Sequence, residues 1–119
     1  MDVESKPNDC MKKINQFLHL EVPPMNEGHL VVGIWGSIRQ DAVPGFKSEM
    51  MNIIMSEMLV KLTLDFTRVD FIDSQGLAVI YEMFLALKDK GAAFEIINAS
   101  SNISNLFLLT RLHQLFTIR

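Results

Sequence analysis

The sequence predicts an α/β fold with a small mixed sheet of about four to five strands and helices mainly on one face. Segments with the two-residue apolar period of strands alternate with segments that have the three-to-four-residue period of helices. Their order is strand, strand, helix, strand, helix, strand, helix, strand, which leaves room for right-handed crossovers. The chain has 119 residues, of which 49% are apolar, so one core is expected and two are not.

Composition limits the possible functions. The formal net charge of −3 argues against a nucleic-acid surface, which needs a clustered excess of Lys and Arg. Cys10 is the single cysteine, so an internal disulfide is impossible, and the three histidines are scattered, so no metal site is expected. No stretch approaches the ~18 apolar residues of a membrane span. We expect a cytoplasmic protein without a cofactor, without direct nucleic-acid binding and without direct membrane contact.

The first part of the chain predicts a leader and a hairpin. Residues 1–13 are polar and are expected to form a flexible leader, with a single domain over residues 14–119. A first strand is expected within 14–22, and Pro23-Pro24 ends it. A turn at 26–28 leads to a second strand at 29–35, which should pair antiparallel with the first.

Residues 41–58 have the pattern of a helix. Asp41 is placed to cap it and Pro44 is acceptable in its first turn. The residues expected to face inward are Phe46, Met50, Ile53 and Ile54. A second line consists of Met51, Met55 and Met58. Met suits both a pliable binding surface and flexible core filling, and we favour core filling.

The segment Leu64–Ile80 joins a strand, a tight loop and a helix start. Apolar residues at strand spacing precede the loop, namely Leu62, Leu64 and Phe66. Apolar residues at helix spacing follow it, namely Leu77, Ile80, Phe84 and Leu87. Asp73 stands at the helix N-cap, which makes Ser74 the first helical residue. Its hydroxyl would lie at the positive end of the helix dipole, where a phosphoryl group is well tolerated.

The remaining elements follow from similar signals. Lys88, Lys90 and Gly91 mark the end of the helix. A strand is expected at 93–98, and Ser100, Ser101 and Asn102 offer caps for another helix. One side of that helix is expected to contain Ile103, Leu106, Phe107 and Thr110. Residues 116–118 should form a last short edge strand.

The pattern L-x-L-D-F-x-x-V-x-F-I-D-S-x-G-L-x-V-I at residues 62–80 resembles the signature of the STAS domain. Within that family it is similar to the bacterial anti-sigma factor antagonists, and the resemblance extends from about Gly28 to the C-terminus. It implies that Ser74 is the acceptor for a serine kinase that is itself the anti-sigma factor. Asp73 and the pair Gly76-Leu77 match the motif, whereas Gln75 stands where family members usually have Ser or Thr.

A second match lies earlier in the chain. Residues 36–38, Gly-Ser-Ile, resemble the G-x-L step that opens the first helix region of STAS domains. In the family the loop that follows lies beside the acceptor Ser and touches the partner, and an acidic residue is often found where this chain has Arg39. Arg39 is therefore expected either to pair with a phosphate on Ser74 or to be an ordinary exposed loop residue. The residues expected to bind the partner are Ile38, Arg39, Asp73, Gln75, Gly76 and Leu77.

The resemblance implies a phosphorylation-controlled protein-binding switch. The unphosphorylated chain would bind the anti-sigma serine kinase, phosphorylation of Ser74 would release it, and a serine phosphatase would restore the first state. The chain would be a substrate and not an enzyme, and a monomer or weak dimer. An alternative is a STAS accessory subunit of a membrane transporter or of a larger signalling complex.

Two other interpretations of the Asp-Ser pair are open. The pair is also a common helix cap without any further role. A serine hydrolase is disfavoured, because Ile72 stands where the G-x-S-x-G elbow requires Gly. His113 is the only histidine expected near a wall of the sheet, and nothing in the sequence places it beside Ser74.

Overall fold

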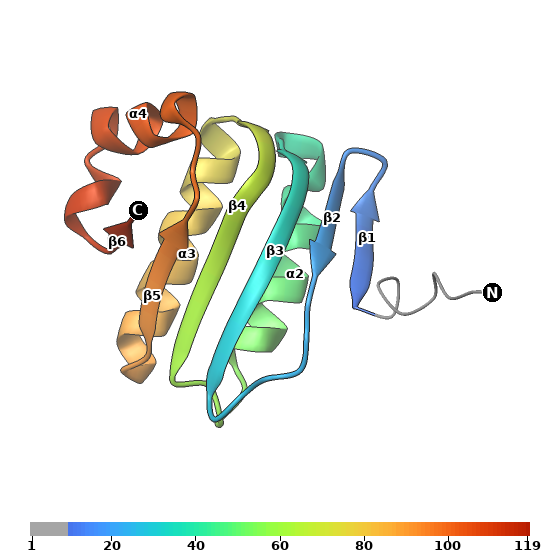
Figure 1. Ribbon diagram of the computed structural model, residues 1–119, viewed down its shortest axis with the longest axis vertical. Coiled ribbons are helices and arrows are strands. Elements are labelled where there is room, and N and C mark those ends of the chain that lie inside the picture. The colour runs from blue at the N-terminus through green and yellow to red at the C-terminus, as the bar shows by residue number, and fades with distance from the viewer. Residues whose placement is uncertain (1–9) are drawn as a thin grey trace.

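The computed structural model describes residues 10–119 and has one sheet of six strands and three α-helices in this part of the chain (Figure 1). The α/β prediction is confirmed, with more strands than the four to five expected. The elements are β1 (Met11–Asn15), β2 (Leu18–Glu21), β3 (His29–Ile38), the 3-10 turn η1 (Gln40–Ala42), α2 (Val43–Ile54), β4 (Lys61–Ile72), α3 (Ser74–Lys90), β5 (Ala93–Ile97), α4 (Ser101–Leu109), the 3-10 turn η2 (Leu112–Gln114) and β6 (Thr117–Ile118).

The strands lie in the sheet in their chain order. β1, β2 and β3 pair antiparallel, whereas β3, β4, β5 and β6 pair parallel. Each parallel connection between β3, β4 and β5 contains a helix, as parallel strands require. Figure 1 shows α2 and α3 behind the sheet and α4 beyond one end of β5. The segments that follow β3 and β4 consequently leave the same edge of the sheet.

The N-terminal part differs from the expected single strand. Met11–Lys13, which the sequence pattern placed in the leader, belong to β1, and a turn at Gln16–Phe17 separates β1 from β2. Residues 1–9 lie outside the described part of the chain. The expected antiparallel pairing of the segment before Pro23 with the segment after Gly28 is confirmed by β2 and β3.

Strand β3 is longer than expected. Gly36–Ile38 do not open a helix but continue β3, because pairing with β4 extends to the Ile38–Ile72 pair. Gly36 has a φ of 112°, and a Cβ there would lie 2.0 Å from the carbonyl oxygen of Phe17. The tight approach of the β1–β2 turn therefore requires Gly at this position of β3.

Helix α2 is shorter at both ends than the helix expected over 41–58. It begins at Val43 after η1, and its N-cap Ala42 makes no side-chain capping bond, so the expected cap by Asp41 is wrong. It ends at Ile54, where the Nζ of Lys90 donates to the carbonyl oxygen of Ile54 at 2.6 Å. A cation from α3 thus binds the C-terminal end of α2, where the helix dipole favours positive charge.

The early end of α2 changes the position of the methionines. Met50 is fully buried and Met51 is half-buried, as core residues are. Met55 and Met58 lie beyond the helix and are 77% and 71% exposed. The prediction that Met55 and Met58 fill the core is therefore wrong. Both residues follow the last residue of α2, so helical spacing does not direct them toward the core.

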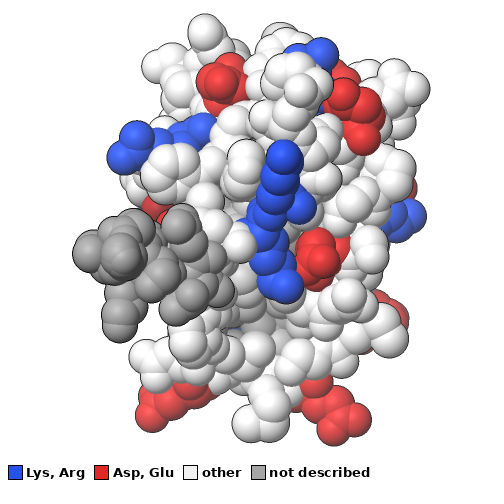
Figure 2. Space-filling model, turned by 90° about the vertical axis from the view of Figure 1, so that its right-hand side faces the viewer, with Lys and Arg blue, Asp and Glu red and all other residues white. Residues whose placement is uncertain are grey.

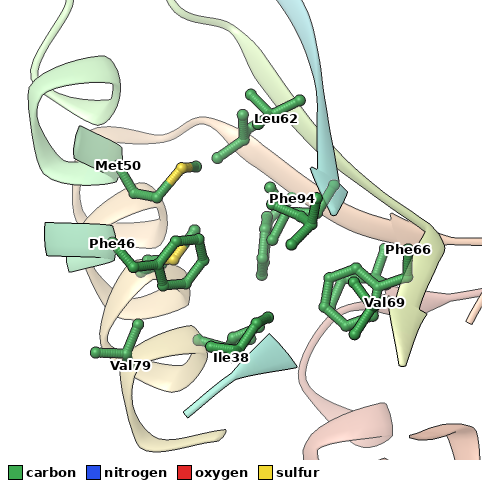
Figure 3. Packing of buried hydrophobic residues seen from close by; sticks show 14 of the residues in the cluster. Ile38, Phe46, Met50, Leu62, Phe66, Val69, Val79 and Phe94 are labelled. Carbon is green, nitrogen blue, oxygen red and sulfur yellow. The ribbon is translucent and has the colours of Figure 1, made fainter. Parts of the chain in front are cut away.

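The core lies between the sheet and the pair α2 and α3. Figure 3 shows Phe46 and Met50 of α2 directed toward the sheet residues Leu62 and Ile38, and Val79 of α3 belongs to the same buried cluster. The strand residues Leu62, Leu64 and Phe66 are all buried, as their spacing predicts. None of the helices described over residues 10–119 has the length and apolar character needed to cross a membrane.

The C-terminal elements form as expected, except that Thr110 lies just after α4, as its C-cap, and is exposed. Gly91 ends α3 with a φ of 81°, and Ser100 caps α4 by accepting a hydrogen bond from the N–H of Ile103 at 3.3 Å. Phe107 packs against Phe116 and Phe66 with ring centroids 6.3 and 6.2 Å apart. β6 is a short strand parallel to β5.

Charged side chains are mixed on the described surface. Ion pairs connect Lys12 of β1 with Glu49 of α2 at 3.7 Å, and Lys47 of α2 with Glu82 of α3 at 2.7 Å. Figure 2 shows a line of Lys and Arg side chains on one face, with Asp and Glu around it. Neither sign of charge covers that face.

A buried carboxylate lies on the sheet face opposite the helices. Glu95 accepts a hydrogen bond from the hydroxyl of Thr63 at 3.1 Å and forms ion pairs with Lys61 at 3.2 Å and Arg119 at 3.3 Å. Burial by itself raises the pKa of Glu95, but the bonds from Lys61 and Thr63 and the charges of Lys61 and Arg119 outweigh it. The pKa is therefore lowered from its ordinary value of 4.5.

This carboxylate makes folding stability depend on pH. Because its pKa is lower in the folded chain, Glu95 stabilises the fold above about pH 4.5, and this contribution is lost as the pH falls through the folded-state pKa. We expect Glu95→Gln to be less stable at pH 7 and to lose less stability on acidification than the parent protein. Urea unfolding between pH 3 and 7 measures both effects. The control is Glu57→Gln, at an exposed position, and an equally steep acid decline in Glu95→Gln would contradict the assignment.

Candidate functional site

The site forms where β3 and β4 end side by side. The pairing of these parallel strands continues to Ile38 and Ile72. The next residue after β4, Asp73, donates its N–H to the carbonyl oxygen of Ile38 at 3.2 Å. The segment after β3 and the start of α3 are therefore held together although 33 residues separate them in the sequence.

The Asp73 carboxylate joins these two segments. Asp73 has the extended backbone of an N-cap, and its Oδ1 accepts a hydrogen bond from the N–H of Gly76 at 2.9 Å. The predicted cap is thus confirmed. Its Oδ2 accepts from the N–H of Gln40 in η1 at 2.8 Å. Sequence reasoning missed this second bond, because no local pattern relates Gln40 to Asp73.

The double role of Asp73 predicts a measurable loss of stability. Asp73→Ala removes acceptors from the N–H groups of Gly76 and Gln40, and we expect the free energy of unfolding to fall by about 1 kcal/mol. Asp73→Asn is the matched control for the cap, because its one carbonyl oxygen can still accept from Gly76 but its amide cannot also accept from Gln40. Urea denaturation should give the highest free energy of unfolding for the parent, a lower one for Asp73→Asn and the lowest for Asp73→Ala. An Asp73→Ala variant as stable as the parent would contradict this role.

Ser74 is the first residue of α3 and is exposed to solvent, as is Gln75. α3 has 17 residues, so its N–H groups and dipole present a positive end at Ser74. An incoming protein can reach the Ser74 hydroxyl without displacing core side chains. The sequence predicted this placement correctly.

Gly76 explains how α3 approaches the sheet so closely. It is buried, and a Cβ at this position would lie 2.6 Å from the carbonyl oxygen of Ile38 and 2.7 Å from Cγ1 of Ile72. The contact requires a residue without a side chain. Gly76 therefore sets the distance between the start of α3 and the end of β3.

The residues expected to bind a partner fall into two groups. Arg39 and Gln75 are exposed, and Asp73 and Leu77 are half-buried. The side chain of Ile38 is fully buried in the core, so the expectation that this side chain contacts a partner is corrected to a role in packing. Gly76, also buried, has a structural role at the same contact.

A surface hollow of about 520 Å³ lies beside Asp73, the residue before Ser74. Its lining consists of Arg39, Gln40, Asp41, Pro44 and Asp73. The guanidinium of Arg39 lies 4.6 Å from the ring centroid of Phe17, in the β1–β2 turn. Sequence reasoning did not connect Phe17 with the site, since their contact depends on the packing of that turn.

The outer side of α3 continues this surface. Ser74, Ala78, Tyr81 and Leu85 are spaced by four, three and four residues and all are exposed. This spacing places them on one side of the helix. Two large apolar side chains, Tyr81 and Leu85, therefore follow Ser74 along a surface that is open to a partner.

The arrangement does not support hydrolase chemistry. His113 lies in η2, where its Nδ1 is 3.4 Å from the carbonyl oxygen of Phe107. It does not line the hollow beside Asp73. A general base for Ser74 would have to lie within hydrogen-bond reach of its hydroxyl.

The chain is similar to proteins of known family. The family model of the STAS domain matches residues 22–119. The anti-sigma-B factor antagonist of Listeria monocytogenes is 24% identical over 102 residues, which cover 86% of this chain and 89% of the relative.

Solved structures share the fold at low identity. The Bacillus protein SpoIIAA in its phosphorylated form has a TM-score of 0.68 and 16% identity, over 84% of this chain and 90% of that chain. A sulfate transporter family protein of Wolinella succinogenes has a TM-score of 0.64 and 15% identity, over 77% of this chain and 74% of that chain. The family model covers most of the sequence, including both β3 and the segment around Ser74, and the chain therefore belongs to the STAS domain family.

Proposed function

We propose that this protein is an anti-sigma factor antagonist whose partner is an anti-sigma serine kinase. One observation carries the proposal: Ser74 is exposed at the first position of α3, directly after the capping Asp73. The similarity to the Listeria antagonist over most of both chains supports the same role. The phosphorylated SpoIIAA structure shows that a protein of this fold carries a phosphoryl group.

In the unmodified protein the binding surface consists of the Ser74 end of α3, its outer side with Tyr81 and Leu85, and the loop that contains Arg39. Burying the two apolar side chains against the kinase contributes to affinity. Binding sequesters the kinase and so frees the sigma factor or other target. In this role the chain acts by occupying a protein surface, and it needs no catalytic group of its own.

Phosphorylation reverses this binding. The Oγ of Ser74 attacks the γ-phosphorus of ATP in the kinase, ADP leaves, and the hydroxyl proton passes to a base of the kinase. The new group adds about −1.5 to −2 charges at pH 7. These charges would have to be desolvated at the interface, whereas in the free chain they face water and the positive end of α3. A serine phosphatase then hydrolyses the phosphate ester, with water as the acceptor, and restores the hydroxyl.

The fold tolerates this cycle because Ser74 makes no part of the core. Both partners would be encountered in the cytoplasm, with the chain as a monomer or weak dimer. ATP and its Mg²⁺ would be bound by the kinase, and this chain would be its substrate.

The direct test is incubation with a candidate anti-sigma kinase and ATP, followed by peptide mass spectrometry. Phosphate should appear on Ser74 and be absent from a Ser74→Ala control. Phosphorylation of another residue, or of none by a kinase that forms a stable complex with the chain, would refute the proposal.

A second candidate function is that of a STAS subunit in a transporter or larger signalling complex. Gln75 favours it, because its bulk alters the surface directly beside the acceptor. The Wolinella protein shares only the fold at 15% identity and therefore does not decide between the two. Affinity purification separates them: a histidine-kinase-like ATPase supports the first function and a transporter ATPase the second.

A further inference from the structure

We propose that Arg39 senses the modification of Ser74 by exchanging partners. In the unmodified chain its guanidinium stacks on Phe17, and after phosphorylation it binds the phosphate and releases the Phe17 ring. This inference rests on the proposed phosphorylation of Ser74. It adds a second place, the β1–β2 turn, where the modification changes the surface of the molecule.

The backbone holds Arg39 close to Asp73, the residue directly before Ser74. The residue before it, Ile38, accepts a hydrogen bond from the N–H of Asp73 at 3.2 Å. The residue after it, Gln40, donates its N–H to the carboxylate of Asp73 at 2.8 Å. Arg39 is thus held between two residues that both bind the immediate neighbour of Ser74, and its side chain and Asp73 line the same hollow.

The charges of the hollow favour the exchange. Among the residues that line it, Arg39 is the cation, and Asp41 and Asp73 are the acids. Ser74 directly follows Asp73, so a phosphate there would add negative charge next to the hollow, and the guanidinium of Arg39 is the cation in the hollow that can pair with it. Arg binds phosphate through two parallel charge-assisted hydrogen bonds, which are stronger than stacking on an aromatic ring at an exposed position.

The Arg39 guanidinium can leave the Phe17 ring without disturbing the fold. Phe17 is 40% exposed, so its ring is not needed to fill the core. Its carbonyl oxygen accepts a hydrogen bond from the N–H of Ser37 at 2.9 Å, and this backbone contact fixes the turn independently of the ring. Loss of the guanidinium would therefore expose an aromatic side chain without unfolding the β1–β2 hairpin.

The second pKa of a phosphate on Ser74 shows whether Arg39 pairs with that phosphate. The full chain is prepared with phosphoserine incorporated at position 74 by amber-codon translation, so that no kinase is required. The pKa is then measured by ³¹P NMR titration, starting from an ordinary value of about 6. A nearby guanidinium stabilises the dianion and lowers this pKa, and the carboxylates of Asp41 and Asp73 oppose that effect.

Two substitutions should shift this pKa in opposite directions. Arg39→Ala removes the counter-ion, and we expect the pKa of the phosphate to rise by about 0.5. Phe17→Ala removes the competing ring, leaves Arg39 available to the phosphate, and should lower the pKa. Arg68→Ala is the matched control, because Arg68 stacks on Trp35 at 4.7 Å in the same manner but does not line the hollow, and it should leave the pKa unchanged.

The Arg39 inference and the proposed function are contradicted by different results. An unchanged pKa in Arg39→Ala would overturn the pairing, and an unchanged or raised pKa in Phe17→Ala would overturn the exchange with the ring. Amide NMR spectra of each variant confirm that it is folded. Failure of a kinase to modify Ser74 would instead count against the proposed function, since the titration does not depend on any kinase.

Discussion

Ser74→Asp is expected to weaken binding to the anti-sigma partner by a factor of about 30, which corresponds to about 2 kcal/mol. The substitution places a permanent negative charge at the centre of the proposed interface, where it must lose water or face a like charge. The free energy of unfolding should change by less than about 0.5 kcal/mol, because Ser74 is exposed and the first turn of a helix favours acidic residues. Titration calorimetry and urea denaturation measure the two quantities.

Ser74→Asn is the matched control for this substitution, since Asn has nearly the shape of Asp without its charge. If charge is the cause, Asn should retain most of the affinity, and the loss in the Asp variant should shrink at high salt. Equal losses for Asn and Asp would show that size alone governs the interface. If Ser74→Asp unfolds but its folded fraction binds normally, the proposal that charge at position 74 acts on partner binding would be wrong.

Gly76→Ala is expected to lower the free energy of unfolding by about 2 kcal/mol. A new Cβ would lie 2.6 Å from the carbonyl oxygen of Ile38 and 2.7 Å from Cγ1 of Ile72. Overpacking of this kind costs about 1–3 kcal/mol, and the helix propensity that Ala gains over Gly recovers only part of it. Because α3 must move to relieve the contact, partner binding should weaken as well. Thermal and urea unfolding measure the first effect.

Gly45→Ala provides the comparison in another helix. A Cβ at Gly45 of α2 would lie 3.0 Å from Cγ2 of Ile14 and 4.0 Å from the Ile14 carbonyl oxygen, so it meets no atom as closely as a Cβ at Gly76 does. This substitution should cost clearly less than Gly76→Ala, because the contact is less close and Ala favours the helix. If both substitutions had the same effect, the close approach of α3 to β3 would not be the reason for Gly at position 76.

The start of α3 could be predicted because its signals are local. Asp73 caps the helix through the N–H of Gly76, three residues along the chain, and apolar residues at helix spacing follow immediately. The same is true of Ser100 and α4 and of Gly91 at the end of α3. In each case the capping residue interacts with backbone groups of the adjacent helix turn, so a few neighbouring residues are enough to predict the helix end.

The sequence-based predictions were wrong where contacts with distant segments of the chain determine the structure. Gly36–Ile38 remain in β3 because β4 pairs with them, and α2 ends at Ile54, where Lys90 of α3 donates to the carbonyl oxygen of Ile54. The exposure of Met55 and Met58 follows from that early end. Local patterns carry no information about these partners.

The sequence by itself determined the α/β order of elements from β2 onward and the position of Ser74 at a helix start, since periodicity and capping act over a few residues. The tertiary structure alone decided that Asp73 also binds Gln40, that Gly76 packs against Ile38, and that Arg39 lies over Phe17. Those contacts join segments that are far apart in the chain. They exist because parallel pairing of β3 and β4 brings both strand ends to one edge of the sheet, with the β1–β2 turn packed against the end of β3.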